Sequence, residues 1–566
     1  MYQFIGMKSK KMDLIKAFDR PQSPFYCKDD FILFNSKNSI SSDNNGLVIL
    51  IDGYIENCES KGDTISLIEQ CYCKYGDDFV SELDGAFSMV LFDRDKDKLI
   101  LSVDKIGVKS LYYYQKDDML LFSNSLDALL NVRGIKHQID IDGLTELLSI
   151  SPAKRDSSAV LKAFRALPAA SIITQDSTFK IKKYWDIKYR QYNQTLEETF
   201  ANVNALLSNA VNKHFKDDKL KYGSMLSGGL DSSIISKLAS LNTDLKMFSV
   251  TYPDHEKDFL SSEFQPESDA AWVEKVKKQI DGDLQYVKIE PDRLAENLLK
   301  AVRLRGLPGM ADVDSSLLLF ADEINKNVDI CFSGEGADEL FGGYPWFYKE
   351  NVLNNGRFPW SSDISFRKSF LNKSLQSKIN IESFIKSCID ESMKSSPKYF
   401  GDDEQENNIR QLFFVNMQYF MKNLLIRCET MGQGLDIRMP FADRELIEYV
   451  WNVPWKVKNY NNYEKSLLRG SFKGLLEDDC LWRKKSPYPK TFNPKYTETI
   501  QGLLKTELKN SPLNEIIDMD VLKGYIDAPQ SITKPWFGQL LTGPQLLAYF
   551  LQMHYWLVEY NIDILT

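Results

Sequence analysis

The chain has 566 residues, of which 26% are charged and 43% hydrophobic, and its formal net charge is −9. This length allows two or more domains with sizeable cores. The acidic balance, without a long run of lysine or arginine, argues against nucleic acid as a partner. Residues 1–18 lack the apolar stretch of a signal peptide and no segment reaches membrane-spanning length, so we expect a cytoplasmic protein with no membrane partner.

The reactive side chains that often build metal or disulfide centres are dispersed. The eight cysteines form no C-x-x-C pair, and the four histidines lie far apart in the sequence. This distribution argues against a zinc ribbon, a disulfide framework and a histidine-based catalytic centre.

Short strand patterns separated by turn residues dominate the first 185 residues. The predicted strands are 47–52, 86–92, 98–103 and 110–114, and helical patterns cover 64–75 and 142–149.

A second part begins near Thr195, after the polar stretch 187–194. From there, helical patterns alternate with strands of the buried type at 223–226, 246–251, 284–289 and 328–332. Such alternation predicts a parallel, doubly wound sheet whose site lies at the carboxyl ends of the strands. From about residue 360 onward the pattern is mostly helical.

The strand pattern at 222–226 leads through a seven-residue loop into an apolar helical run. The loop residues are Ser227, Gly228, Gly229, Leu230, Asp231, Ser232 and Ser233. Strand, glycine turn and helix together point backbone N–H groups at an anion, and adjacent glycines let the backbone approach phosphates closely. A carboxylate beside polyphosphate repels it unless a divalent cation lies between them, so Asp231 is a candidate Mg²⁺ ligand. The lysine and spacing of the common P-loop are absent, so this is not that loop. The sequence SGGLDSS resembles the loop of ATP pyrophosphatases, which release AMP and pyrophosphate.

An acidic loop, Ser333-Gly-Glu-Gly-Ala-Asp-Glu339, follows the strand pattern at 328–332 and would face the same crevice. Asp338 is a candidate second Mg²⁺ ligand, and Glu335 is a candidate base or amine-binding group. Further along, a basic cluster at 481–488, preceded by Lys465 and Arg469, would neutralise the leaving pyrophosphate.

In order and spacing, these motifs resemble those of asparagine synthetases along almost the whole chain. The matching stretches are SGGLDSS (227–233), SGEGADELFGGY (333–344), GLDIRMPFAD (434–443), EKSLLR (464–469) and LWRKKSPYPKT (481–491). In the N-terminal part, GDT (62–64), LDGAF (83–87) and DKIGVKSLY (104–112) resemble the family's class II amidotransferase domain. The resemblance implies an antiparallel β-sandwich of the Ntn type over 1–186. Over 195–566 it implies a synthetase domain with a doubly wound parallel sheet and a helical extension.

The resemblance also implies a mechanism, in which ATP activates a carboxylate as an acyl-adenylate and ammonia or another amine displaces AMP. Asp231 and Asp338 would hold Mg²⁺, Lys485 aligns with the family's catalytic lysine, and Glu335 aligns with its intermediate-site glutamate. The nucleotide would contact the loop 227–233 together with Ser333 and Gly334, and Leu226 and Val250 would line the adenine pocket. The family often forms homodimers, although nothing in the sequence fixes an interface.

The N-terminal part departs from glutamine-using members at the residues that carry the chemistry. Those members have a cysteine nucleophile where this chain has Tyr2. A phenol with a pKa of about 10 cannot replace a thiolate at neutral pH. The family's oxyanion-hole asparagine is Asp52 here, and the region of its substrate-binding arginine, 30–34, holds no arginine; Asp63 alone keeps the position that holds the glutamine amine. We therefore predict an amidotransferase scaffold without glutaminase chemistry.

The synthetase part departs as well, because the family's Asp-Arg-Met-Ser-Met stretch reads Arg427-Cys-Glu-Thr-Met431. We predict an ATP-dependent amide ligase and keep two alternatives for its acid, a small molecule or a peptide carboxylate. Glu335 favours ammonia-dependent asparagine synthesis, because β-lactam-forming relatives hold tyrosine there. The missing cysteine and the altered stretch favour an enzyme that tailors a specialised metabolite or peptide, as β-lactam synthetases and lasso-peptide cyclases do. A nucleotide-binding pseudoenzyme is a third alternative, disfavoured by the intact Asp231, Asp338 and Lys485.

Overall fold

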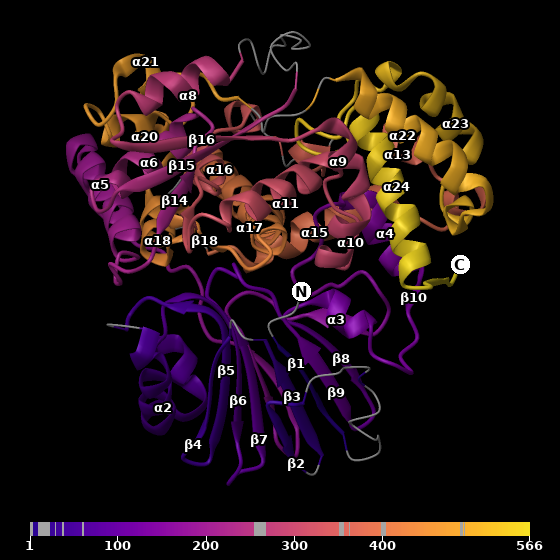
Figure 1. Ribbon diagram of the computed structural model, residues 1–566, viewed down its shortest axis with the longest axis horizontal. Coiled ribbons are helices and arrows are strands. Elements are labelled where there is room, and N and C mark those ends of the chain that lie inside the picture. The colour runs from indigo at the N-terminus through magenta and orange to yellow at the C-terminus, as the bar shows by residue number, and fades with distance from the viewer. Residues whose placement is uncertain are drawn as a thin grey trace.

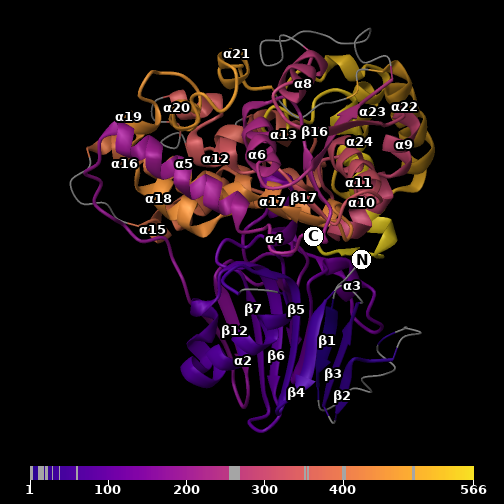
Figure 2. The ribbon, with the colours of Figure 1, turned by 60° about the vertical axis from the view of Figure 1, so that its left-hand side comes forward.

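The protein has a strand-rich N-terminal half and a C-terminal half in which helices surround a parallel sheet (Figures 1 and 2). The computed structural model describes residues 4–9, 18, 23–28, 30–36, 39–58, 61–253, 268–349, 352, 356–361, 363–397, 403–486, 491 and 493–566. In these ranges, the chain forms no helix that is both long and apolar enough to span a membrane.

Two six-stranded antiparallel sheets build the N-terminal half. The first has the order β11 (Phe164–Ala166), β8 (Tyr112–Lys116), β9 (Met119–Ser123), β1 (Phe4–Lys8), β3 (Phe31–Asn35) and β2 (Tyr26–Lys28). The second has the order β13 (Phe179–Lys183), β12 (Ser171–Gln175), β7 (Lys98–Val103), β6 (Gly85–Asp93), β5 (Leu47–Ile55) and β4 (Ile40–Asn44). The sheets face each other across an apolar core, in which the rings of Phe31 and Phe92 lie 4.7 Å apart. This packing confirms the predicted β-sandwich.

The predicted elements of this half match the structure closely. The strand 98–103 and the helix 64–75 have the predicted bounds. The strand predicted at 110–114 begins and ends two residues later. The shift follows from a tight hairpin, because Lys116 pairs with Met119 and Asp117 adopts a left-handed backbone with φ of +52°.

A five-stranded, wholly parallel sheet forms the centre of the C-terminal half. Its order is β16 (Gly282–Lys288), β15 (Leu245–Thr251), β14 (Tyr222–Met225), β17 (Ile330–Phe332) and β18 (Asp436–Arg438). The three central strands carry the loops that the sequence assigns to the site, so these loops meet at one edge of the sheet. We did not predict β18, because three residues are too few to give a periodic pattern.

Helices pack on both faces of this sheet and extend beyond it (Figure 1), as predicted for the C-terminal half. Among the described residues, the N-terminal half contains α2 (Thr64–Tyr75), α3 (Leu126–Leu130) and α4 (Ile141–Ile150). The C-terminal half contains α5 (Leu196–Asn212), α6 (Leu230–Ser240), α8 (Ala270–Lys277), α9 (Pro291–Glu296), α10 (Leu298–Arg305), α11 (Asp312–Ile324), α12 (Ala337–Phe341), α13 (Ile364–Ser369), α14 (Lys373–Gln376), α15 (Ile381–Ser395), α16 (Glu404–Asn416), α17 (Lys422–Met431), α18 (Arg444–Asn452), α19 (Trp455–Lys458), α20 (Ser466–Ser471), α21 (Asp478–Leu481), α22 (Pro494–Glu507), α23 (Met519–Asp527) and α24 (Pro544–Glu559). A π-helical turn, Met417–Met421, joins α16 to α17. A capping box between Thr195 and Glu198 starts α5, the first helix of this half. This explains why the second part begins at Thr195.

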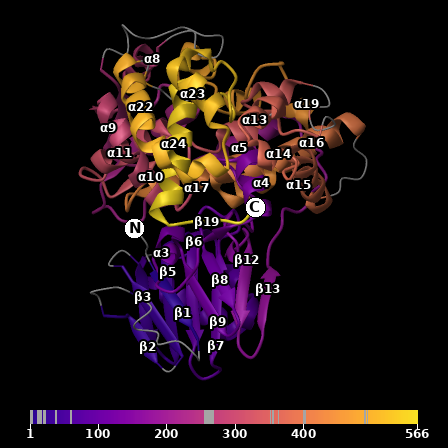
Figure 3. The same ribbon diagram turned by 90° about the vertical axis from the view of Figure 1, so that its right-hand side faces the viewer.

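Polar contacts and a short sheet join the two halves. Arg444 of α18 donates two hydrogen bonds to Asp84, at 2.8 and 3.0 Å, and Lys105 binds the same carboxylate at 2.7 Å. Near the C-terminus, β19 (Asp563–Ile564) pairs in parallel with β10 (Gln138–Ile139), so the end of the chain lies at the boundary (Figure 3).

Candidate functional site

The loop after β14 has the shape that its glycines predict. Gly228 adopts a left-handed backbone with φ of +70°, and a Cβ there would lie 2.7 Å from the backbone nitrogen of Val273. Gly229 then serves as the N-cap of α6, so the free N–H groups of that helix open at the end of the loop. A side chain at residue 228 would therefore push α8 away from the loop.

The loops after β14 and β17 touch each other. A Cβ on Gly334 would lie 2.8 Å from the backbone nitrogen of Ser232, so only glycine allows this approach. Together the loops border a cavity of about 250 Å³. Twelve of the residues that the sequence assigns to the site line it, namely Leu226, Ser227, Gly229, Leu230, Asp231, Ser232, Val250, Ser333, Gly334, Glu335, Asp338 and Lys485.

Gly228 and Ser233 lie behind the cavity wall rather than on it. Ser233 Oγ donates to the carbonyl oxygen of Gly229 at 2.6 Å, and the hydroxyls of Ser227 and Ser232 lie 3.0 Å apart. The serine hydroxyls therefore shape the loop through internal hydrogen bonds. Ser227 and Ser232 also line the cavity.

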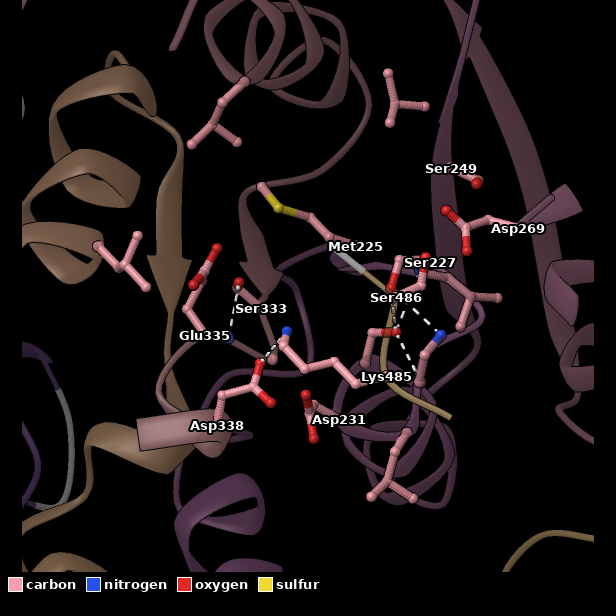
Figure 4. Close-up of a pocket in the computed structure, with 18 of the residues that line it drawn as sticks. Met225, Ser227, Asp231, Ser249, Asp269, Ser333, Glu335, Asp338, Lys485 and Ser486 are labelled. Atoms are coloured by element: carbon pink, nitrogen blue, oxygen red, sulfur yellow. Dashed lines mark hydrogen bonds and ion pairs between the residues drawn. The ribbon is translucent and has the colours of Figure 1, made fainter. Parts of the chain in front are cut away.

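Two lysines pair with the two predicted metal ligands: Lys465 bridges Asp231 and Asp338, and Lys485 pairs with Asp338 (Figure 4 shows the second pair). Lys465 Nζ lies 2.7 Å from Asp231 Oδ2 and 2.6 Å from Asp338 Oδ1, and Lys485 Nζ lies 2.7 Å from Asp338 Oδ2. Burial alone would raise the pKa of Asp338, but the two ammonium groups hold that pKa well below its usual range. Burial raises the pKa of Asp231, which binds only one of the two lysines. The cluster therefore balances two carboxylates with two ammonium groups at the edge of the cavity.

The neighbouring Glu339 is 1% exposed and accepts a hydrogen bond from the Tyr344 hydroxyl at 2.6 Å. Burial, followed by the charge of Asp338, raises the pKa of Glu339 from 4.5 to about 8. A carboxyl group whose pKa is raised in the folded state stabilises the fold below its unfolded pKa and loses that contribution as pH rises to the folded value.

We therefore expect Glu339→Gln to flatten the pH dependence of stability. We expect the parent protein to lose roughly 1 kcal/mol of its free energy of unfolding per pH unit as the pH rises from 4.5 to about 8, and the variant to lack this loss. Urea unfolding at several pH values measures the slope. A variant with the parent's slope across this window would show that Glu339 is ionised in the folded protein throughout.

An ion pair borders the cavity beside the loop after β17. Arg427 Nη2 donates to Glu335 Oε1 at 2.8 Å, and the Arg427 side chain is 3% exposed. Cys428, the next residue on α17, lines the same cavity. The altered stretch 427–431 thus brings a positive charge to Glu335, a pairing that the sequence did not predict.

Comparison with known proteins places this geometry in a family. The model of the asparagine synthase family matches residues 202–558, and that of the glutamine amidotransferase domain matches residues 51–185. The chain belongs to the asparagine synthase family. Membership makes it a carbon–nitrogen ligase of the asparagine synthetase type.

The relatives cover most of the chain. Asparagine synthetase [glutamine-hydrolyzing] 3 of Bacillus subtilis is 37% identical over 89% of this chain and 84% of its own length. Asparagine synthetase [glutamine-hydrolyzing] 1 of the same organism is 25% identical over 85% of this chain and 83% of its own length. Amidase chyE of Penicillium rubens is 24% identical over 87% of this chain and 82% of its own length.

The amidotransferase part of this asparagine synthase family member holds a buried ion cluster. Lys109 Nζ lies 3.3 Å from Asp52 Oδ1 and also pairs with Glu429 of α17. Asn124 donates to the second oxygen of Asp52 at 3.0 Å. Asp52, which the sequence resemblance assigns to the oxyanion-hole position, is thus part of an ion cluster that reaches into the synthetase half.

The other positions of the predicted glutaminase site are less informative. Tyr2 lies outside the described residues. Asp63 is exposed at the start of α2, and residues 31–34 are buried in β3.

Sequence reasoning did not include Lys465 among the site residues, although it named this lysine in a basic cluster. The motif EKSLLR carries the only signal. Lys465 adopts a left-handed backbone with φ of +53°, and its side chain is 3% exposed between the two aspartates. Neither property can be read from the spacing of basic residues.

Proposed function

We propose that this protein adenylates a carboxylate with ATP, releases pyrophosphate, and transfers the acyl group from AMP to ammonia or another amine. The observation that carries the proposal is the gathering of Asp231, Asp338, Lys465 and Lys485 beside the loop 227–233 in one cavity. Fixed cations next to an anion-binding loop stabilise a leaving pyrophosphate most where its charge develops.

The two aspartates fit a Mg²⁺ ion shared with the substrate. Asp338 Oδ1 is buried and accepts no hydrogen bond of good geometry from any described residue, although Lys465 Nζ lies 2.6 Å away. No cluster of three or more candidate metal-binding side chains occurs in the described part of the chain. Magnesium sites that use one or two carboxylates and complete their shell with phosphates and water have this composition. Asp231 and Asp338 would hold the ion, which would supply positive charge to neutralise the triphosphate.

The remaining residues of the cavity have distinct tasks in this proposal. Backbone N–H groups at the start of α6 bind the phosphates, and Leu226 and Val250 contact the adenine. Lys485 moves its ammonium group from Asp338 toward the phosphates. Lys465 stays buried and keeps the two carboxylates ionised and close together.

We also propose that glutamine is not the nitrogen source. Lys109 neutralises Asp52, and Lys109 and Asn124 each contact one of its two carboxylate oxygens. A carboxylate has no hydrogen to donate, so Asp52 cannot stabilise an oxyanion as an asparagine amide does. Together with Tyr2 in place of the nucleophilic cysteine, this leaves the N-terminal half without the groups for amide cleavage. Its remaining task would be to pack against the synthetase half.

Isotope labelling tests the nitrogen source. We expect ¹⁵N-ammonium to label the amide product, and amide-labelled ¹⁵N-glutamine to leave it unlabelled. Mass spectrometry of the product distinguishes the two. Labelling from glutamine in the absence of free ammonium would overturn this part of the proposal.

A second candidate function is the tailoring of a specialised metabolite or a peptide. The Arg427–Glu335 pair favours it, because it changes the charge where the acid of an asparagine synthetase would lie. The division into domains at 1–186 and 195–566, the cytoplasmic location and a homodimer remain predictions alongside both candidates.

A further inference from the structure

The cavity continues beyond the phosphate site into an apolar chamber. The chamber residues come from three separate segments, which are α11 with its preceding turn, the helix from Met417 to Met431, and the loop 537–540. Its apolar side chains are Met310, Leu317, Phe420, Leu424, Phe537 and Leu540.

The order of the strands separates this chamber from the adenine pocket. Val250 lies near the carboxyl end of β15, the phosphate loop follows β14, and Glu335 follows β17, and these strands are adjacent in that order. The adenine and the acid therefore bind on opposite sides of the phosphate loop, and the chamber lies on the acid side with Glu335.

Helix periodicity places the chamber wall next to the Arg427–Glu335 pair. Phe420, Leu424, Arg427 and Cys428 recur at helical spacing on one face, and all four line the cavity. The apolar part of this stripe thus leads directly to the ion pair.

Aromatic contacts connect the chamber to the reacting end of the site. Lys485 Nζ lies 4.9 Å above the ring of Tyr344, which packs edge-on against Phe420 at 5.1 Å. Phe420 in turn stacks on Phe537 at 5.0 Å. A carboxyl group held near Lys485 would therefore place the rest of its molecule against these rings.

The charges at the chamber edge do not suit aspartate. Glu335 is already paired with Arg427 at 2.8 Å, so its charge is neutralised before an amino acid's ammonium group arrives. The polar side chain that the loop 537–540 contributes to the cavity is Gln539, which carries no charge. Beyond the ion pair, an acid with an ammonium group and a second carboxylate would have to desolvate both charges against the apolar side chains Met310, Leu317 and Phe420.

We propose that the acid activated by this enzyme carries an apolar, ring-sized group that occupies the chamber, in place of the amino and carboxylate groups of aspartate. The inference rests on the adenylation proposed above and names the class of its substrate. Leu540 is then a residue that determines specificity, because it lies half-buried on the chamber wall.

Acid-dependent ATP–pyrophosphate exchange tests the inference, with 3-phenylpropanoate as the apolar probe and succinate and aspartate as polar acids. We expect kcat/KM for 3-phenylpropanoate to exceed that for aspartate by about 100-fold, as a matched apolar pocket allows. Exchange with aspartate that equals or exceeds exchange with 3-phenylpropanoate would overturn the inference but leave the adenylation intact. Absence of exchange with every acid would contradict the adenylation itself, and the inference with it.

A matched pair of substitutions locates the effect in the chamber. We expect Leu540→Asn to lower kcat/KM for 3-phenylpropanoate about 10- to 100-fold through KM, with an unchanged KM for ATP. Leu241→Asn is the control, because Leu241 is 67% exposed on the surface. Thermal unfolding and the KM for ATP show that both variants are folded. Equal kinetics of the Leu540 variant and the parent protein would overturn the inference.

Discussion

Replacing Lys485 with alanine is expected to lower acid-dependent ATP–pyrophosphate exchange by about 10³-fold, or ~4 kcal/mol of transition-state stabilisation. The physical reason is that Lys485 is the cation at the cavity edge whose partner, Asp338, is also held by Lys465. Lys485 can therefore transfer its hydrogen bonds to phosphate without leaving a buried carboxylate unpaired. Initial exchange rates at saturating ATP and Mg²⁺ measure the effect.

The adjacent Lys484 supplies the control. It is exposed and does not line the cavity, so Lys484→Ala removes the same charge from the same segment without changing the site. We expect its exchange rate to stay within about twofold of the parent rate. Equal losses in the two variants would mean that the segment's charge or fold, rather than the ammonium group at residue 485, supports the reaction.

The second large effect is on stability, at the ion cluster between the halves. Lys109→Met is expected to lower the free energy of unfolding by about 3–5 kcal/mol, because it leaves Asp52 and Glu429 as uncompensated charges in a site where Lys109 is 12% exposed. Chemical denaturation followed by tryptophan fluorescence measures the change. If unfolding proceeds in two steps, the loss should fall on the step that separates the halves.

Two further variants test whether the loss of stability comes from leaving buried charges unpaired, rather than from losing an ion pair as such. The exposed pair Lys182–Asp78 is the control, and Lys182→Met should cost less than about 1 kcal/mol. The triple variant Asp52→Asn, Lys109→Met, Glu429→Met removes all three charges and should regain most of the lost stability. A triple variant as unstable as the single one would show that packing, not unpaired charge, dominates at this site.

The fold could be predicted largely from local patterns. Strands such as 98–103 and the helix 64–75 have strong alternation or helical periodicity, and the structure confirms them. The loop after β14 was recognisable from its two adjacent glycines, of which Gly228 adopts a left-handed backbone that other residues rarely take. The three-residue strand β18 could not be found this way, because its place beside β17 depends on the sheet rather than on its own residues.

The candidate site could be predicted only in part, and the missing part depends on tertiary contacts. Asp231 and Asp338 are recognisable from their motifs, but Lys465 joins them from a segment more than a hundred residues away. The sequence indicated a charge change at 427–431, yet it did not reveal that Arg427 pairs with Glu335 while Glu429 pairs with Lys109. Arg427 and Glu429 lie on different faces of α17, so this helix contacts both the acid site and the N-terminal half.

Adenylation is tested most directly by acid-dependent ATP–pyrophosphate exchange, with the nucleotide products identified. We expect exchange that requires both an acid and Mg²⁺, and AMP as the nucleotide product when an amine is added. Formation of ADP and phosphate, or the absence of exchange with every polar and apolar acid, would contradict it.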